Sequence, residues 1–201
     1  VGYQSGQTSQ GTKTTAIGYQ CGQTSQGDKS ISIGYECGKT SQGIQCVAMG
    51  YRSGYDTQLQ QSVAIGHQSG MTSQGSQSVA IGLNAGQTGQ NTQSVALGFS
   101  AGYTFQGSES VAVGHRSGET SQGVQAVSVG YNSGQIGQNS FSIAVGSNAG
   151  QSNQGTSSVA VGIDAGQISQ SAQSVSVGYQ SGQTSQGTKT TAIGYQCGQT
   201  S

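Results

Sequence analysis

Glycine recurs at every sixteenth position along the whole chain, and no insertion or deletion interrupts the spacing. One series begins at Gly2 and Gly18 and ends at Gly194, and a second series from Gly6 to Gly198 keeps the same step. A fixed short period is the signature of a solenoid, in which each unit buries its surface only against its neighbours. The low content of charged residues, 6%, together with abundant Gly and Gln would fit a disordered low-complexity segment, but disorder gives no reason for a constant register. The sequence therefore predicts a repeating unit, or coil, that runs from one glycine of a series to the next.

Aligning the chain on this period gives columns numbered from Val1, and each column samples one position of the coil. Columns 1 and 15 are aliphatic or β-branched in every coil. They lie two residues apart, so their side chains share one face of a strand, which we expect to be the core face. The expected core includes Val63, Ile65, Val79 and Ile81, and the turn that follows includes Gly66 and Gly70.

Columns 14 and 16 hold small residues only, mainly Ser and Ala, and point to the opposite face of that strand. A freely solvated face would be expected to accept long or charged side chains, as column 4 does at Arg52 and column 13 does at Lys13. We therefore expect another copy of the protein to pack flat against this face, the alternative being a smooth exposed sheet. The expected inter-chain contact strip is Ala64, Ala80, Ala96, Ala112, Ala144 and Ala160.

Columns 7 to 10 read Gln-Thr-Ser-Gln with slight variation and predict a second strand in each coil. Column 10 is Gln in every coil, and identical amides stacked about 4.8 Å apart can hydrogen-bond to each other along the axis. The predicted fold is all-β: a parallel β-solenoid, or β-roll, with 16 residues per coil and about 12.5 coils.

The chain also contains a repeat longer than one coil. Residues Val1–Ser25 recur letter for letter as Val177–Ser201, a displacement of eleven coils. We expect residues 1–201 to be a single continuous solenoid segment of a longer repetitive chain.

No catalytic or metal-binding constellation can be assembled from the scattered acidic residues, so we expect neither an enzyme nor a cofactor. His67 and His115 share column 3 with tyrosines and are predicted members of an aromatic stack. The formal net charge of zero argues against nucleic acid as a partner. No apolar run approaches the roughly 20 residues that span a bilayer, so no membrane insertion is expected in this segment.

Two of the four cysteines, Cys21 and Cys37, occupy column 5 of adjacent coils. Stacked positions about 4.8 Å apart lie within the Cα range of a disulfide, so a coil-to-coil disulfide is feasible. The alternative is that Cys substitutes for Ser or Ala in a column of small residues. Cys197 repeats the position of Cys21 in the longer repeat, and Cys46 has no evident partner.

The pentapeptides Ser-Val-Ala-Ile-Gly at Ser62–Gly66 and Ser-Val-Ala-Val-Gly at Ser110–Gly114 resemble the head repeats of trimeric autotransporter adhesins, and the related repeats of phage and giant-virus fibre proteins. That resemblance implies a left-handed β-roll, usually a homotrimer or part of a fibre bundle, that binds a host surface or matrix. It also implies an extracellular location, at a cell or virion surface. The period of this chain is longer than the one typical of the bacterial heads.

A weaker resemblance is to bacterial ice-nucleation repeats, through Gly2, Tyr3, Ser5, Gln7 and Thr8. It implies ice binding as the alternative function. Column 6 is Gly in every coil, so the paired threonine of those repeats is missing here.

Overall fold

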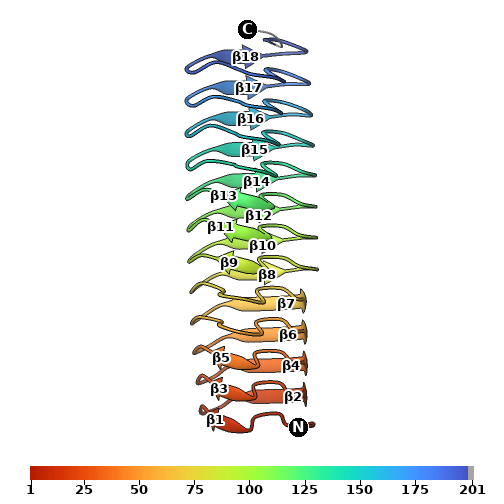
Figure 1. Ribbon diagram of the computed structural model, residues 1–201, viewed down its shortest axis with the longest axis vertical. Coiled ribbons are helices and arrows are strands. Elements are labelled where there is room, and N and C mark those ends of the chain that lie inside the picture. The colour runs from red at the N-terminus through yellow and green to blue at the C-terminus, as the bar shows by residue number, and fades with distance from the viewer. Residues whose placement is uncertain (199–201) are drawn as a thin grey trace. The chain divides into compact units, whose positions relative to one another are not determined.

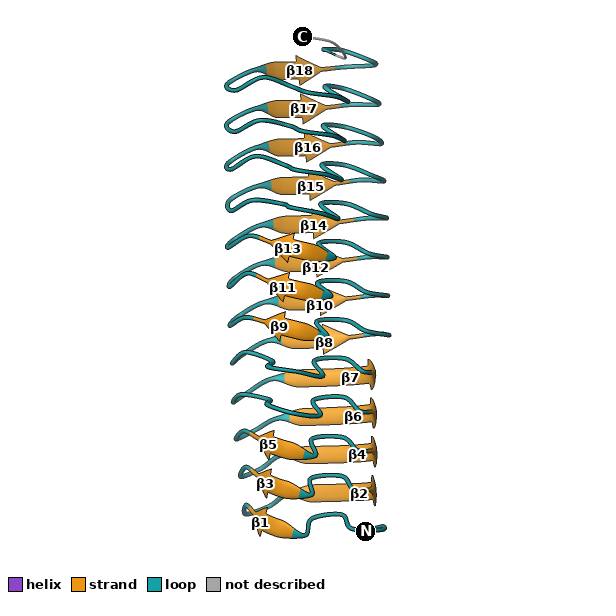
Figure 2. Ribbon diagram, viewed as in Figure 1, coloured by secondary structure: helices purple, strands orange, loops and turns teal. Residues whose placement is uncertain are grey.

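The computed structural model describes residues 1–198, and within them it contains strands and turns but no helix (Figure 2). The end of the predicted longer repeat, residues 199–201, lies outside this described part. Two compact units are distinguished, Val1–Thr104 and the remainder from Phe105 onward. Each unit is a parallel β-solenoid, as the constant glycine period predicts. That the two units form one continuous solenoid stays a prediction.

A main sheet runs through the first unit, with one strand from each coil stacked in parallel on the next (Figure 1). Its strands are β2 (Thr15–Tyr19), β4 (Ile31–Tyr35), β6 (Val47–Tyr51), β7 (Val63–His67), β8 (Val79–Ile81) and β10 (Val95–Leu97).

The second unit repeats this arrangement. Its main-sheet strands are β12 (Val111–Val113), β14 (Val127–Val129), β15 (Ile143–Val145), β16 (Val159–Val161), β17 (Val175–Val177) and β18 (Thr191–Ile193).

The predicted second strand of the coil is present as a short strand in several coils and as isolated parallel bridges in others. These strands are β1 (Thr8–Gln10), β3 (Thr24–Gln26), β5 (Thr40–Gln42), β9 (Thr88–Gln90), β11 (Thr104–Gln106) and β13 (Thr120–Gln122). Paired positions lie one full coil apart, as Val63↔Val79 and Thr8↔Thr24 illustrate, so the predicted register is confirmed.

The strand face that we predicted to point outward lies inside the coil, and the predicted core face points outward. The small side chains of columns 14 and 16 are buried inside the coil, and Ser62 and Ala64 are 0% exposed. The aliphatic residues Val63 and Ile65 alternate with them and point outward, where they are only half-buried. The expected core of Val63, Ile65, Val79 and Ile81 is therefore wrong, although the sharing of one face by columns 15 and 1 is right.

The space inside the coil is taken by the glutamines of column 10. Gln58 is 0% exposed, and its amide nitrogen donates to the carbonyl oxygens of Val47 at 2.9 Å and Ser62 at 3.2 Å. Gln74 repeats the first of these bonds toward Val63 at 2.8 Å. With a glutamine lying across the interior of each coil, the opposite strand has room only for a methyl, hydroxyl or thiol group. This explains why columns 14 and 16 never hold a large residue.

The predicted contact strip of Ala64, Ala80, Ala96, Ala112, Ala144 and Ala160 is corrected by the same observation, because all six side chains are 0% exposed within the single chain. No second copy can reach them. The steric restriction inferred from column 16 is real, but the glutamines of the same chain impose it.

Gly66 and Gly70 meet different constraints. Gly70 lies in a turn at φ 50°, and a Cβ there would approach the Gln74 side chain to 2.8 Å and the Ala64 methyl to 3.3 Å. Gly66 lies within the end of strand β7 at φ 132°, where a Cβ would collide with the carbonyl oxygen of Gly82 in the next coil. Both positions have positive φ, which glycine adopts at little cost.

Candidate assembly surface

Each main sheet presents an apolar outer face, which consists of the outward side chains of columns 15 and 1. In strand β8 the alternation places Val79 and Ile81 outward on either side of the buried Ala80. Exposure on this face reaches 43% at Ile17 and 42% at Leu97 in column 1, whereas column 15 side chains such as Val79 are half-buried. The second unit has the same pattern, with Val129 and Ile143 exposed. Because adjacent strands are in register, the outward side chains form continuous aliphatic rows along each unit.

A row of aromatic rings borders this face. The rings of Tyr19 and Tyr35 stack with their centroids 4.9 Å apart, and Tyr51 stacks on His67 at 4.8 Å. In the second unit His115 stacks on Tyr131 at 4.9 Å. These distances match the spacing of strands in a sheet, which places equivalent rings directly above one another. The prediction that both histidines belong to an aromatic stack is confirmed.

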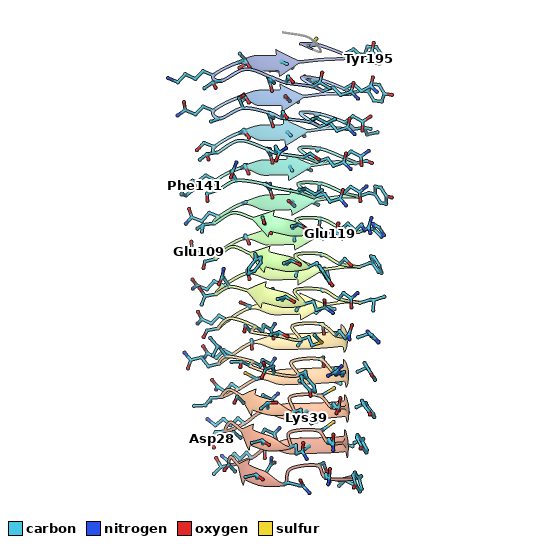
Figure 3. All side chains as sticks on the ribbon, viewed as in Figure 1. Asp28, Lys39, Glu109, Glu119, Phe141 and Tyr195 are labelled. Atoms are coloured by element: carbon cyan, nitrogen blue, oxygen red, sulfur yellow. The ribbon has the colours of Figure 1, made fainter. Side chains whose placement is uncertain are left out.

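Figure 3 shows how the side chains of the second unit are distributed around the coil. Tyr195 projects from one edge, and Glu109 and Phe141 project from the opposite edge. The aromatic row and the charged or bulky substitutions of column 13 therefore lie at different corners of the coil. Neither corner contributes to the interior.

Amide ladders hold neighbouring coils together both inside and outside. In the interior, Gln42 donates to Gln58 at 3.2 Å and Gln154 donates to Gln170 at 3.3 Å, which confirms the predicted ladder of column 10. On the surface, the column 13 residue Gln61 donates to Gln45 at 3.2 Å. The interior bonds join some pairs of neighbouring coils and not others, since the side-chain oxygens of Gln26 and Gln74 accept no hydrogen bond.

One charged cluster interrupts this neutral surface and was not anticipated from the sequence. The Glu36 carboxylate lies 2.6 Å from the Lys39 ammonium and 3.3 Å from the Arg52 guanidinium, and both cations lie over the ring of Tyr55. The hydrogen bond with Glu36 raises the pKa of Lys39, and the hydrogen bond with Tyr55 raises the pKa of Arg52. The cluster carries one net positive charge, and because Glu36 and Arg52 belong to adjacent coils we interpret it as a structural link between those coils. Its spacing of three residues, Glu36 to Lys39, is the only local signal for it in the sequence.

The column 5 cysteines Cys21 and Cys37 lie in adjacent coils, as the period predicts. Cys21 and Cys37 are 0% exposed, free, and packed with Ala48 in one buried cluster. The neighbouring Cys37 side chain raises the pKa of Cys21, and burial raises it further. Cys46 is also buried and free, but its sulfur lies near Ser62 in another column of the interior.

The described residues 1–198 contain no group of three or more His, Cys, Asp or Glu side chains that could hold a metal ion. Over the same residues, no helix has the length and apolar character needed to cross a membrane.

A match to a known family model falls on the Ser-Val-Ala-Ile-Gly segments of the first unit. Residues 60–85 match the YadA head domain repeat, in two copies. The match covers strands β7 and β8, whose outward rows include Val63 and Val79. It confirms the resemblance to adhesin head repeats that the pentapeptides indicated, and together with the solenoid it describes an adhesin-like structural protein. Searches of curated proteins and of solved structures found no significant match to this chain.

Proposed function

We propose that this chain is a segment of an adhesin-like fibre at a cell or virion surface, which self-associates through the outer face of its main sheet and contacts a host surface or matrix. The observation that carries the proposal is the continuous apolar outer face, with side chains such as Ile17 and Leu97 exposed by more than two-fifths in the single chain. A large contiguous apolar surface on a protein commonly marks an interaction site.

A second copy of the same chain is the occupant that this face fits best. Its rows repeat at the strand spacing, so another copy in register presents the same period over any number of coils. The match of residues 60–85 to a head repeat of trimeric adhesins supports this choice, and the near absence of charge on the face favours a dry contact.

The energetics make association depend on length. Burying a whole Val or Ile side chain stabilises by about 1.5–3 kcal/mol, so burying a remaining two-fifths contributes roughly 0.6–1.2 kcal/mol. Column 15 side chains such as Val79 are less exposed than this, so each coil contributes on the order of 1 kcal/mol. Association costs on the order of 4–15 kcal/mol in lost freedom of motion, so several coils must act together before assembly is favourable.

The test compares two double variants of the full chain. Val79→Lys with Ile81→Lys places two charges on the outer face of strand β8. The matched control, Gln77→Lys with Gln93→Lys, places them on the exposed column 13, where Lys13 and Lys29 occur naturally. We expect light scattering after size exclusion to show a reduced mass for the first variant only, with β-type circular dichroism retained in both. An unchanged mass for the first variant would contradict the proposal.

Ice binding is a second candidate, favoured by one observation. Thr8, Thr24 and Thr40 lie in register on successive coils and form a regular row of hydroxyl groups. The row is interrupted at Asp56. Thermal hysteresis of the purified chain, with Thr24→Val and Thr40→Val as the comparison, would separate this function from adhesion.

A further inference from the structure

The pair of buried cysteines in column 5 is the chemical feature that the proposed function does not use. Cys21 and Cys37 follow strands β2 and β4, which pair in register from Thr15↔Ile31 to Tyr19↔Tyr35. The amide of Gly22 donates to the carbonyl oxygen of Cys37 at 2.9 Å, so the register continues through the cysteines. Adjacent coils therefore place the two Cα atoms about 4.8 Å apart, inside the range that a disulfide spans.

The two side chains also share one orientation. The Cys21 thiol donates to the Gly34 carbonyl oxygen at 2.9 Å, and the Cys37 thiol makes the equivalent bond to Gly50 at 2.9 Å. Because the coils are in register, the two thiols stack one above the other, a single coil spacing apart. The Cβ atoms of residues stacked in this way lie about 4.8 Å apart, slightly beyond the ~3.5–4.5 Å of a disulfide, so the bond requires both side chains to rotate and the two turns to approach by a few tenths of an ångström.

From this geometry we propose that Cys21 and Cys37 form an oxidative cross-link that fastens the second coil of this chain to the third. The link closes a loop of one coil and therefore restricts the unfolded chain locally. It does not involve Cys46, whose sulfur lies beside Ser62 in another column of the interior.

The interior tolerates the loss of both thiol hydrogens. In some other coils column 5 is alanine, as at Ala85 and Ala101, and both are fully buried although an alanine has no side-chain donor for the carbonyl group of the next coil. A disulfide adds no atom to the cavity and removes two hydrogens. Neither the packing of column 5 nor its hydrogen bonding therefore opposes the link.

The bond forms by thiol–disulfide exchange with a small disulfide oxidant such as oxidised glutathione. The thiolate of one cysteine attacks the oxidant and releases one glutathione thiol, and the second cysteine then displaces the other. The two thiol protons end on the two released glutathione molecules, and the two cysteine sulfurs are oxidised as the glutathione disulfide is reduced. Because both side chains are 0% exposed, exchange takes place while these coils fold and not in the closed coil.

The experiment uses the full chain, unfolded in denaturant and refolded in a mixture of reduced and oxidised glutathione. The remaining thiols are alkylated in denaturant, and the chain is digested with trypsin. Cleavage after Lys13, Lys29, Lys39 and Arg52 places Cys21, Cys37 and Cys46 on three separate peptides, so mass spectrometry identifies the link directly. We expect alkylated thiols to fall from four to two and residues 14–29 to be joined to residues 30–39.

Two variants complete the test. Cys37→Ala, a residue that column 5 accepts elsewhere, should leave three alkylated thiols and no joined peptides, and Cys46→Ala should leave the link intact. The link should also resist a mild reductant in the folded chain and be reduced in denaturant, which shows that it is buried. Four alkylated thiols in the refolded parent chain, or a link from Cys21 to a cysteine other than Cys37, would overturn the proposal.

Discussion

Replacing a buried glutamine of column 10 should destabilise the fold more than replacing an exposed glutamine of the same coil. Gln58 and Gln61 lie in the same coil, three residues apart, and each makes amide hydrogen bonds to the equivalent glutamine of a neighbouring coil. They differ in burial, since Gln58 is 0% exposed and Gln61 lies on the surface. Replacing each glutamine by alanine removes the same side-chain groups, once from the interior and once from the surface.

The expected cost of Gln58→Ala follows from its contacts. The variant removes the amide hydrogen bonds to the carbonyl oxygens of Val47 and Ser62, which contribute about 0.5–1.5 kcal/mol each. It also removes one buried methylene group, worth roughly 0.8 kcal/mol, together with the amide, and leaves a cavity that the rigid coil cannot close. The Gln42 amide loses its bond to Gln58 but keeps the carbonyl of Ile31. We expect a destabilisation of about 3–5 kcal/mol in total.

Gln61→Ala should cost less than about 1 kcal/mol, because water replaces the exposed amide bonds that it loses. Guanidinium unfolding of both variants, followed by circular dichroism, measures the difference from the midpoints and slopes. If the two variants unfold within about 0.5 kcal/mol of each other, the glutamine column does not fill the interior and the reasoning fails.

Three further predictions follow from the same packing. Ala80→Arg should abolish β structure locally and lower the melting temperature, whereas Gln77→Arg should leave both unchanged, because only the first places a guanidinium inside the coil. Gly66→Ala should destabilise the fold by more than about 2 kcal/mol, because Gly66 has a positive φ and a Cβ there would collide with the carbonyl oxygen of Gly82. Denaturant unfolding measures this change, and equal stability would rule out the close stacking of these two glycines. Burial and the charge of Glu36 raise the pKa of Tyr35, so the neutral Tyr35 side chain stabilises the fold and this stabilisation should be lost as pH rises above the usual tyrosine value of about 10. Ultraviolet titration of Glu36→Gln should show the pKa of Tyr35 moving back down.

The sequence predicted the periodic features well because each depends only on register. A constant step from coil to coil dictates that equivalent residues stack, and the Gln ladder and the Tyr51–His67 stack follow from that alone. The strands were placed correctly for the same reason. Alternation with a period of two then identified which residues share a face, as Val79 and Ile81 do.

Which face lies inside could not be decided by that alternation, because a period of two is symmetric with respect to the two faces. The general preference of aliphatic residues for interiors suggested Val79 over Ala80, and it was misleading here. The better guide was steric. Column 1 accepts Met49, Leu97 and Val113, as a loosely confined surface does, whereas column 16 never exceeds Ala or Ser. The charged cluster was missed because the turn brings Glu36, Arg52 and Tyr55 together from two coils.

Because the small residues lie inside the coil and the aliphatic residues outside, different residues serve folding and assembly. Inside the coil, cohesion comes from amide hydrogen bonds such as Gln58 to Val47 and from close packing of small side chains, so a single chain satisfies its own interior. The aliphatic side chains, which carry most of the hydrophobic driving force, remain on the outer face as Val79 and Ile81 do. Substitutions on the outer face should therefore change association with little effect on the coil, and substitutions of columns 10, 14 and 16 should do the reverse. A chain organised in this way reserves its apolar surface for other molecules, which is the property that a self-associating fibre requires.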